Sequence, residues 1–566
     1  MSILSTETKS WQHRALVPAL LGLVVVVGLV SFGFVIWQWR LEEAARGHAD
    51  RAQKDLDDAR KKAKDDERQL RDRITGLDAE RRKNADEADS ARAQVRELQQ
   101  QLEKATQETA AQKRKYEHTV AGMALDNGLK LCEAGDPQRG LLWLARALEM
   151  APQDATDLRG ATLRNLGCWH RDAPKPQKTI GQADTIGVVA FSADGKFLLA
   201  AGKDNSAQVY QVETGNPIGA PLKHRGPITA ALFTPDSKLV VTAGEDDTVR
   251  TWDANTGKPA AEPMPHSNAV TALALSKDGK LVISASGKSA AVWELLTNKV
   301  IVKELDHEGP VTAVALSPDG KMALVGVGGE ERGARLWTWP ENTRKSVRLD
   351  HYDEVTAVAF SPDGAKILTA SFDKTAQLWD TYPLRRIGKQ PLPHEEKVSV
   401  IAFSPDDKTA ATGSWDKTAR LWNAETGLPL CPPLRHDGRL TAITFSPDGQ
   451  LVLTASVDKT ARLWDAATGR AIGRPLMHDD AVMTAAFSPD GKQLATGGRD
   501  KRVRIWDVPQ PVVPKLDKNT AKRLLLWVQT TTKKELDATG VVHPLDAEEV
   551  QARTKELATL GGPPKM

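Results

Sequence analysis

The sequence predicts a mainly β protein in which about eight copies of a small antiparallel sheet lie between helical segments. A repeat of about 42 residues runs through residues 177–510, and turn residues separate short β-prone runs within each copy. The segments before and after the repeats instead show helical periodicity. At 566 residues, the chain is long enough for several structural units with their own cores.

The clearest copy of the repeat is Val355 to Asp380, with the sequence VTAVAFSPDGAKILTASFDKTAQLWD. Its β-prone runs are separated by two turns, Ser361-Pro362-Asp363-Gly364 and Asp373-Lys374-Thr375. An aromatic residue ends each copy at nearly constant spacing: Tyr210, Trp252, Trp293, Trp337, Trp379, Trp422, Trp464 and Trp506. Each copy is therefore predicted to form one small antiparallel sheet.

This region resembles a WD40 β-propeller, and Leu-Trp-Asp at residues 378–380 and 463–465 matches the family signature. The resemblance implies a ring of about eight blades, with seven blades plus a divergent or displaced unit as the alternative. In the family, the strand before the first copy completes the last blade. Residues 177–180 are placed to close the ring in this way.

The resemblance also implies a hydrogen-bonded lock in each blade, made of a histidine, a Ser or Thr, the turn aspartate and the tryptophan. Three consecutive blades match it with His351, Ser371, Asp373, Trp379; His394, Ser414, Asp416, Trp422; and His436, Ser456, Asp458, Trp464. Seven of the 12 histidines occupy this repeat position, which argues against a metal or catalytic role for them. Blades 1, 3 and 4 depart from the pattern at Tyr210, residues 287–289 and residues 326–333, and we expect them to be less rigid.

The N-terminal region predicts a membrane anchor. No charged residue occurs from Ala15 to Gln38, and Leu20 to Ile36 is nearly all aliphatic and long enough to cross about 30 Å of hydrocarbon. After a short tail of residues 1–14, we therefore predict one transmembrane helix at residues 15–38. A cleaved signal peptide is the alternative, but no small-residue cleavage site follows the apolar run.

Helical segments are predicted on both sides of the repeats. Residues 41–117 are proline-free, rich in charged residues and carry heptad seams with one phase slip, which predicts a coiled-coil stalk that forms a weak homodimer. A solvated single helix or a partly disordered spacer is the alternative. Residues 118–170 contain a hairpin resembling one tetratricopeptide unit, which we interpret as a structural adaptor. The tail, residues 515–566, is predicted to be helical and to pack against the propeller or the hairpin.

The sequence offers little support for chemistry. Its net charge of +3 gives no basic field for nucleic acid, and its three cysteines form no CxxC pair. His170-Arg171-Asp172 imitates a kinase catalytic loop but lacks the asparagine that should follow, and no Walker A, G-x-S-x-G or H-E-x-x-H motif occurs. We predict no catalytic residue, no metal site and no cofactor.

One feature that differs between blades suggests a binding surface. The residue before the turn aspartate is Phe372, Trp415, Val457 and Arg499 in blades 5 to 8, and in the WD40 family this position lies on the partner-facing rim. Aromatic residues there could form a protein-interaction hot spot; the alternative is that they only cover blade edges. Lys374, Lys417, Lys459 and Lys501 could ring the same face as an anion site, although pairing with neighbouring acids is the simpler interpretation.

The order of segments resembles the part that follows the kinase domain in bacterial transmembrane Ser/Thr kinases with WD40 arrays. By this analogy we expect the bacterial cytoplasmic membrane, with the propeller outside. The predicted function is a non-catalytic scaffold that binds a protein partner of unknown identity. The alternatives are a regulatory or sensor subunit for a separate kinase, and an enzyme with an active site on one face of the propeller.

Overall fold

The computed structural model of the chain describes residues 61–62, 64–76, 88–170, 174–339, 345–509, 520–537 and 540–563. The predicted transmembrane segment, residues 15–38, lies outside these ranges. None of the described helices is both long enough and apolar enough to span a membrane. The described parts of residues 132–137 and 159–517 form one compact unit, and those of residues 61–131, 138–158 and 518–563 form another.

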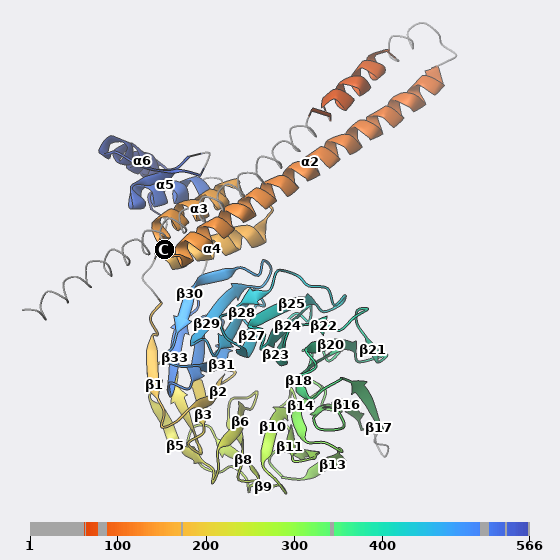
Figure 1. Cartoon of the computed structure of the whole chain (residues 1–566), viewed down its shortest axis with the longest axis vertical. Helices are drawn as coiled ribbons and strands as arrows, with labels where there is room; N and C mark the ends of the chain where they lie inside the picture. Colours follow the sequence, from red (N-terminus) through yellow and green to blue (C-terminus); the bar gives the residue numbers. More distant parts are fainter. Residues whose placement is uncertain are drawn as a thin grey trace, which may run out of the picture. The chain divides into compact units, whose positions relative to one another are not determined.

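The first unit contains a ring of eight antiparallel sheets, the blades, numbered here in chain order (Figure 1). Blades 1 to 4 contain, four strands each, β2 (Ile186–Phe191), β3 (Phe197–Gly202), β4 (Ser206–Gln211), β5 (Pro217–Lys223), β6 (Ile228–Phe233), β7 (Leu239–Gly244), β8 (Thr248–Asp253), β9 (Met264–Pro265), β10 (Val270–Leu275), β11 (Leu281–Ser286), β12 (Ser289–Glu294), β13 (Val300–Asp306), β14 (Val311–Leu316), β15 (Met322–Val327), β16 (Gly333–Thr338) and β17 (Lys345–Asp350).

Blades 5 to 8 continue the same order. They contain β18 (Val355–Phe360), β19 (Lys366–Ser371), β20 (Thr375–Asp380), β21 (Arg385–Arg386), β22 (Leu392–Pro393), β23 (Val398–Phe403), β24 (Thr409–Ser414), β25 (Thr418–Asn423), β26 (Leu434–Arg435), β27 (Leu440–Phe445), β28 (Leu451–Ser456), β29 (Thr460–Asp465), β30 (Ala471–Met477), β31 (Val482–Phe487), β32 (Gln493–Gly498) and β33 (Arg502–Asp507). In blade 5 the short strands β21 and β22 both pair with β20.

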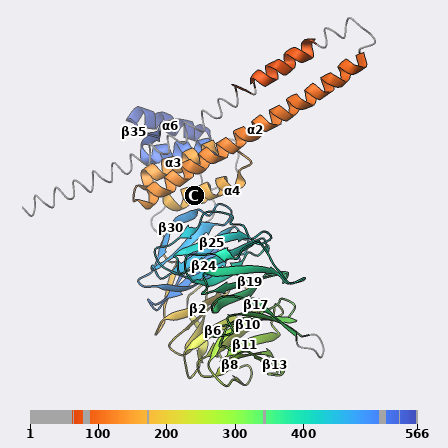
Figure 2. The same ribbon diagram turned by 45° about the vertical axis from the view of Figure 1, so that its right-hand side comes forward.

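The ring closes through the N-terminal strand of the propeller. Strand β1 (Lys178–Gly181) pairs antiparallel with β33, from Lys178 opposite Ile505 to Gly181 opposite Arg502, and so becomes the outer strand of blade 8. The innermost strands of blades 8 and 1, β31 and β2, are also in contact. The predictions of eight blades and of closure by the strand before the first copy are therefore confirmed (Figures 1 and 2).

The hydrophobic core lies between neighbouring blades. One cluster joins Leu368 and Ala370 of blade 5 to Val398 and Trp422 of blade 6, and the others repeat this arrangement around the ring. Alanine at many of these positions lets adjacent sheets approach closely. The turns take part as well: Gly364 has a φ of +74°, and a Cβ there would lie 3.0 Å from Pro318 Cδ in the preceding blade. Glycine is thus required by both conformation and space.

A line of hydroxyl groups crosses most blade junctions near the centre of the ring. The second residue of each inner strand in blades 2 to 7 donates to the first carbonyl of the next inner strand; these donors are Thr229, Thr271, Thr312, Thr356, Ser399 and Thr441. Blades 8 and 1 have Met483 and Gly187 at this position, which carry no side-chain hydroxyl. Blade 1 therefore lacks this bond on both sides, although Val189 N donates to Thr484 of blade 8 at 3.2 Å.

Helix α4 (Thr156–His170) places its C-terminal part, from Arg159 on, against blade 7. Arg164 forms a buried ion pair with Asp465 at 2.9 Å. The Asn165 side chain donates to Ala471 O and accepts from Gly473 N, both at 2.9 Å, at an irregularity in β30. The helix thereby satisfies backbone groups on an outer strand that would otherwise be open to pairing with another chain.

The second unit is helical. It contains α2 (Ala88–Glu133) up to Leu131, α3 (Pro137–Met150) from Gln138, α5 (Thr520–Thr532), α6 (Ala547–Thr559) and a hairpin of β34 (Lys534–Leu536) and β35 (Val542–Pro544). Residues 64–76 are helical too, and α2 runs without a break across residue 118, where the sequence-based boundary falls. Leu98 is only 6% exposed, so part of the seam predicted for a dimer is covered within one chain.

The C-terminal tail packs against the helical hairpin, which is one of the two partners predicted for it from the sequence. Gly540 has a φ of +86°, and a Cβ there would lie 2.7 Å from the Trp143 ring of α3. Lys534 Nζ donates to Gln138 Oε1 at 3.0 Å. Helix α6 begins with a capping box in which Asp546 and Glu549 satisfy each other's backbone N–H groups.

Candidate functional site

Each complete lock joins an aspartate, a histidine, a threonine and a tryptophan. In blade 7, His436 Nδ1 lies 2.8 Å from Asp458, and Trp464 Nε1 donates to Thr454 Oγ1 at 2.8 Å. His436 Nε2 lies 2.7 Å from the same Thr454 oxygen. Because the threonine accepts from tryptophan, it satisfies all partners by donating to an unprotonated Nε2. This arrangement fits a neutral histidine with its proton on Nδ1.

The complete lock is more widespread than the sequence indicated. Blades 2, 6 and 8 have the same bonds, through His224, Thr242, Asp246 and Trp252; His394, Thr412, Asp416 and Trp422; and His478, Thr496, Asp500 and Trp506. In blade 5, His351 contacts Asp373 and Thr369, but Trp379 Nε1 is buried without a hydrogen-bond partner.

The sequence-based prediction of which hydroxyl belongs to the lock is wrong. Ser371, Ser414 and Ser456 do not contact the lock histidine; the hydroxyls that do are two residues earlier, at Thr369, Thr412 and Thr454. Thr412 and Thr454 also accept from the tryptophan of their blade. Positions two apart share one face of a strand, so both hydroxyls point the same way. The serines end their strands and instead connect a loop carbonyl to the backbone N–H of the turn aspartate.

Burial and hydrogen bonding shift the pKa values of several lock residues. Burial lowers the pKa of His436 and His394 despite the neighbouring carboxylates. Burial alone would raise the pKa of Asp373, but hydrogen bonds from His351 and Thr375 bring it down to about 2. A neutral imidazole beside an ionised carboxylate is fully occupied by structural hydrogen bonds, which leaves no free proton donor or acceptor for catalysis.

Blade 4 has a defective lock. Its acid is Glu331, which lies 3.2 Å from His307 and also pairs with Arg335, but the position of the bridging threonine is Val325. As a result, His307 Nε2 and Trp337 Nε1 are both buried without a hydrogen-bond partner. Blade 3 departs differently: His266 bonds to Ser284 and to a backbone carbonyl, with no acid in the lock.

Val325→Thr is expected to stabilise the protein. The new hydroxyl can accept from Trp337 Nε1 and donate to His307 Nε2, and relief of two unsatisfied buried groups should raise the free energy of unfolding by about 1–3 kcal/mol. Urea denaturation measures the change. The matched control is Val347→Thr in the same blade, where the side chain is 50% exposed and little effect is expected. A less stable Val325→Thr protein would contradict this interpretation of blade 4.

The four residues predicted to face a partner occupy equivalent places in blades 5 to 8. The backbone N–H of each donates to the carbonyl of the residue just before the inner strand, at 2.8–3.1 Å; the pairs are Phe372 with Glu354, Trp415 with Lys397, Val457 with Arg439, and Arg499 with Ala481. These eight residues therefore lie on one face, where the inner strands begin. Blade 4 has Gly328 and Pro310 at the same positions.

Phe372 and Trp415 are brought together in a group with two cations. Their ring centroids are 5.7 Å apart at an angle of 59°. Lys397 Nζ lies 4.0 Å from the Phe372 centroid and 5.2 Å from that of Trp415, while Arg439 Cζ lies 4.6 Å from the Trp415 ring. We call these four residues the aromatic–basic surface. The sequence-based prediction missed Lys397 and Arg439. The feature that they share in the sequence is their position directly before an inner strand.

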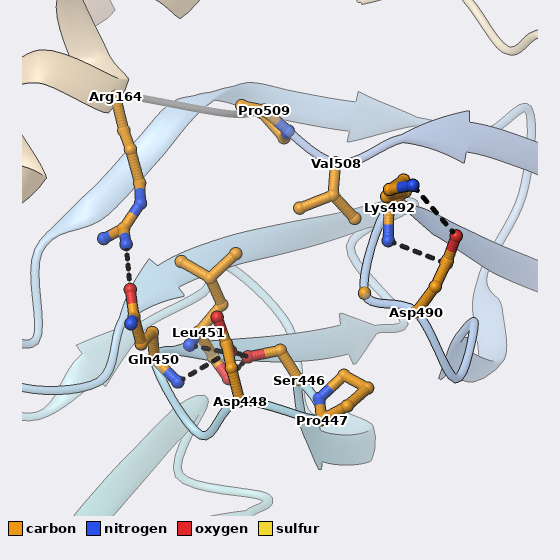
Figure 3. Close-up of a pocket in the computed structure, with 11 residues that line it drawn as sticks. Arg164, Ser446, Pro447, Asp448, Gln450, Leu451, Asp490, Lys492, Val508 and Pro509 are labelled. Atoms are coloured by element: carbon orange, nitrogen blue, oxygen red, sulfur yellow. Dashed lines mark hydrogen bonds and ion pairs between the residues drawn. The ribbon is translucent and has the colours of Figure 1, made fainter. Parts of the chain in front are cut away.

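Other features of the propeller are less suited to binding. A hollow of about 470 Å³ lies under Arg164 between the turns of blades 7 and 8 (Figure 3). Arg164 donates to Gln450, and Asp448 and Asp490 accept within their own turns, so these polar groups are already used. No group of three metal-binding side chains occurs in the described ranges. Burial raises the pKa of the Cys132 thiol to about 12 and that of Cys431 to about 11.

Comparisons with known proteins agree with this geometry. Residues 185–427 match the family described as IFT122 first beta-propeller, and residues 433–465 and 474–507 match the WD domain, G-beta repeat. Together with the closed ring of eight blades, these matches show that the chain is a WD40-repeat β-propeller protein. Propellers of this kind are usually non-catalytic and generally bind proteins.

Among solved structures, the computationally designed Ika8 protein is similar to the propeller. The two chains are 26% identical, the match covers 58% of this chain and 98% of Ika8, and the TM-score is 0.50. A search of curated proteins gave no match.

Proposed function

We propose that the chain is a non-catalytic scaffold that holds a protein partner on the aromatic–basic surface of its propeller. The observation that carries the proposal is the Trp415 side chain, which is 37% exposed although it contacts Phe372 and lies between two cations. A large side chain already held in position loses little entropy on docking and contributes much buried area. Val457 and Arg499 extend the surface along blades 7 and 8.

The test is capture of the partner by the purified chain. Replacement of both Phe372 and Trp415 by serine should abolish capture without unfolding the ring, because neither ring is part of a lock or of the core between blades. Pull-down with quantitative mass spectrometry measures the loss, and circular dichroism checks the fold. The matched control is Tyr352→Ser, since Tyr352 is another exposed aromatic residue of blade 5. Undiminished capture by the double variant would move the binding site elsewhere.

We further propose that the scaffold is anchored in a membrane by residues 15–38, with the propeller outside a bacterial cytoplasmic membrane. The support is the uncharged run from Ala15 to Gln38 and the resemblance of the segment order to transmembrane kinases with WD40 arrays. Wild-type chain in isolated membranes should resist extraction at alkaline pH, and a chain lacking residues 15–38 should be released. Release of the wild-type chain under the same conditions would contradict the anchor.

A further inference from the structure

We propose that the segment docking on the aromatic–basic surface is an acidic peptide that also carries an apolar side chain. This inference rests on the proposed function and adds the chemistry of the partner. Carboxylates of the segment would pair with Lys397 and Arg439, while its apolar side chain would cover the exposed part of Trp415.

The two cations of the surface are not neutralised by the protein itself. Within the described residues, no carboxylate lies within 4.0 Å of Lys397 or Arg439, and both side chains are instead placed on ring faces. A cation on an aromatic face keeps its full charge toward the solvent side. An incoming carboxylate therefore meets two positioned cations without having to break an existing ion pair.

The lysine after the turn aspartate differs in its pairing from blade to blade. In blades 5 and 8, the lysine after the turn aspartate pairs with an acid of the next blade: Lys374 with Glu396 at 3.3 Å and Lys501 with Asp184 at 3.8 Å. For Lys417 of blade 6, the corresponding position is Gly438, two residues after the lock histidine, and the described residues provide no ion-pair partner. Lys417 thus adds a third available cation beside the surface.

Gly438 is required by the packing of blade 7. A Cβ at this position would lie 2.8 Å from Asp458 N and 2.9 Å from Val457 Cγ2, so a larger residue would have to displace backbone. The loop therefore cannot carry the acid found in blade 6 without local rearrangement.

Three acids close to the surface in the chain have contacts elsewhere. The Glu354 side chain lies over Gly328 of blade 4, and the Glu396 carboxylate pairs with Lys374. Asp437 is 92% exposed and lies 3.8 Å from Arg462. Three cations without an ion-pair partner among the described residues, Lys397, Arg439 and Lys417, favour an anionic partner.

Basic and aromatic side chains together could also suggest single-stranded nucleic acid, but the ring geometry argues against it. Bases bind such proteins by stacking on free aromatic faces. Here the two rings are tilted by 59° against each other, and cations lie on the face of each. Rings arranged in this way suit aliphatic and aromatic side chains of a peptide better than planar bases.

Selection from a random peptide display library tests the inference and does not require the partner to be identified first. The immobilised full chain is the bait, and the Phe372→Ser, Trp415→Ser double variant is used for counter-selection. We expect enriched peptides with an excess of Asp and Glu and at least one large apolar residue. Fluorescence polarisation should then show that a labelled peptide binds the Lys397→Gln, Arg439→Gln double variant at least about 10-fold more weakly than it binds the wild-type chain. Binding to the wild-type chain should weaken by a similar factor in high salt.

The outcomes separate this inference from the proposed function. Enrichment of neutral or basic peptides that need Trp415 would overturn the acidic partner but leave the scaffold surface intact. Failure to enrich any peptide that distinguishes wild type from the double variant would overturn both. Tighter binding of labelled oligo-dT than of the selected peptides, lost in Trp415→Ser, would replace the peptide by nucleic acid. Lys492→Gln, in a turn outside the surface, is the matched charge control.

Discussion

Replacement of Asp458 by alanine is expected to lower the free energy of unfolding by about 3–5 kcal/mol. The Asp458 carboxylate accepts from His436 Nδ1, from the backbone N–H of Asp437 and from both the N–H and the hydroxyl of Thr460. His436 and Thr460, which supply three of the four donors, are only 6% exposed, and the loss of their shared acceptor leaves these donors unsatisfied. Chemical denaturation followed by tryptophan fluorescence measures the change.

The control for this prediction is Asp448→Ala in the other turn of the same blade. Asp448 accepts from Ser446 Oγ and from Gln450 N, but its side chain is exposed, so water can replace it as a partner. Its loss should cost about 1 kcal/mol or less. If both aspartates cost the same, the lock would not be a special source of stability, and the repeated histidine would need another explanation.

The repeat could be predicted from sequence because its signal occurs eight times. Aromatic spacing, turns of the Ser-Pro-Asp-Gly kind and the histidine before seven of the eight copies reinforce one another. The closing strand was predicted at residues 177–180 from its place before the first copy, and it forms at residues 178–181. The choice between Ser371 and Thr369 had no such support. Both are hydroxyl residues on the same strand face, and only the His351 ring, whose Nε2 lies 2.8 Å from Thr369 Oγ1, distinguishes them.

The candidate surface was predicted in part. Phe372 and Trp415 follow from their position before the turn aspartate, and the structure brings them into contact. Lys397 and Arg439 were missed because they are 18 residues before Trp415 and Val457, on the far side of a hairpin whose register is not visible in the sequence. The packing of the tail on α3 likewise depends on Gly540 meeting Trp143, a contact for which the sequence carries no periodic signal.

Acidification is expected to unfold the propeller well above the pH at which carboxylates protonate. Burial lowers the pKa of the lock histidines His224, His266, His307, His394, His436 and His478 from its usual value near 6.5. Below about pH 6.5, the unfolded chain binds protons at these sites that the folded chain does not bind. The contribution of these histidines to stability is therefore fully present above pH 6.5, and it declines as the pH falls toward their lowered pKa values in the folded chain.

The size of the effect follows from the number of locks. Within this window, each neutral histidine can lower the free energy of unfolding by up to about 1.4 kcal/mol for each pH unit of acidification. Several histidines acting together should therefore lower it by several kcal/mol between pH 6.5 and 5. The carboxylates cannot account for a loss in this range. Burial alone would raise the pKa values of Asp246, Asp373 and Glu331, but hydrogen bonds in the locks hold all three at about 2, so their contribution declines only once the pH falls below about 4.

Thermal unfolding at constant ionic strength from pH 8 to 4.5 measures this dependence. The midpoint should be nearly level down to about pH 6.5 and then fall steeply, whereas His436→Gln should be less stable at pH 8 but lose less on acidification, because one proton-linked group is gone. His543→Gln, in the tail outside the propeller, should follow the wild-type curve. A midpoint unchanged between pH 7 and 5 would contradict the prediction. It would mean that the lock histidines accept protons without loss of stability, with the threonine hydroxyl turned toward a backbone carbonyl such as Arg462 O, 3.3 Å from Thr454 Oγ1.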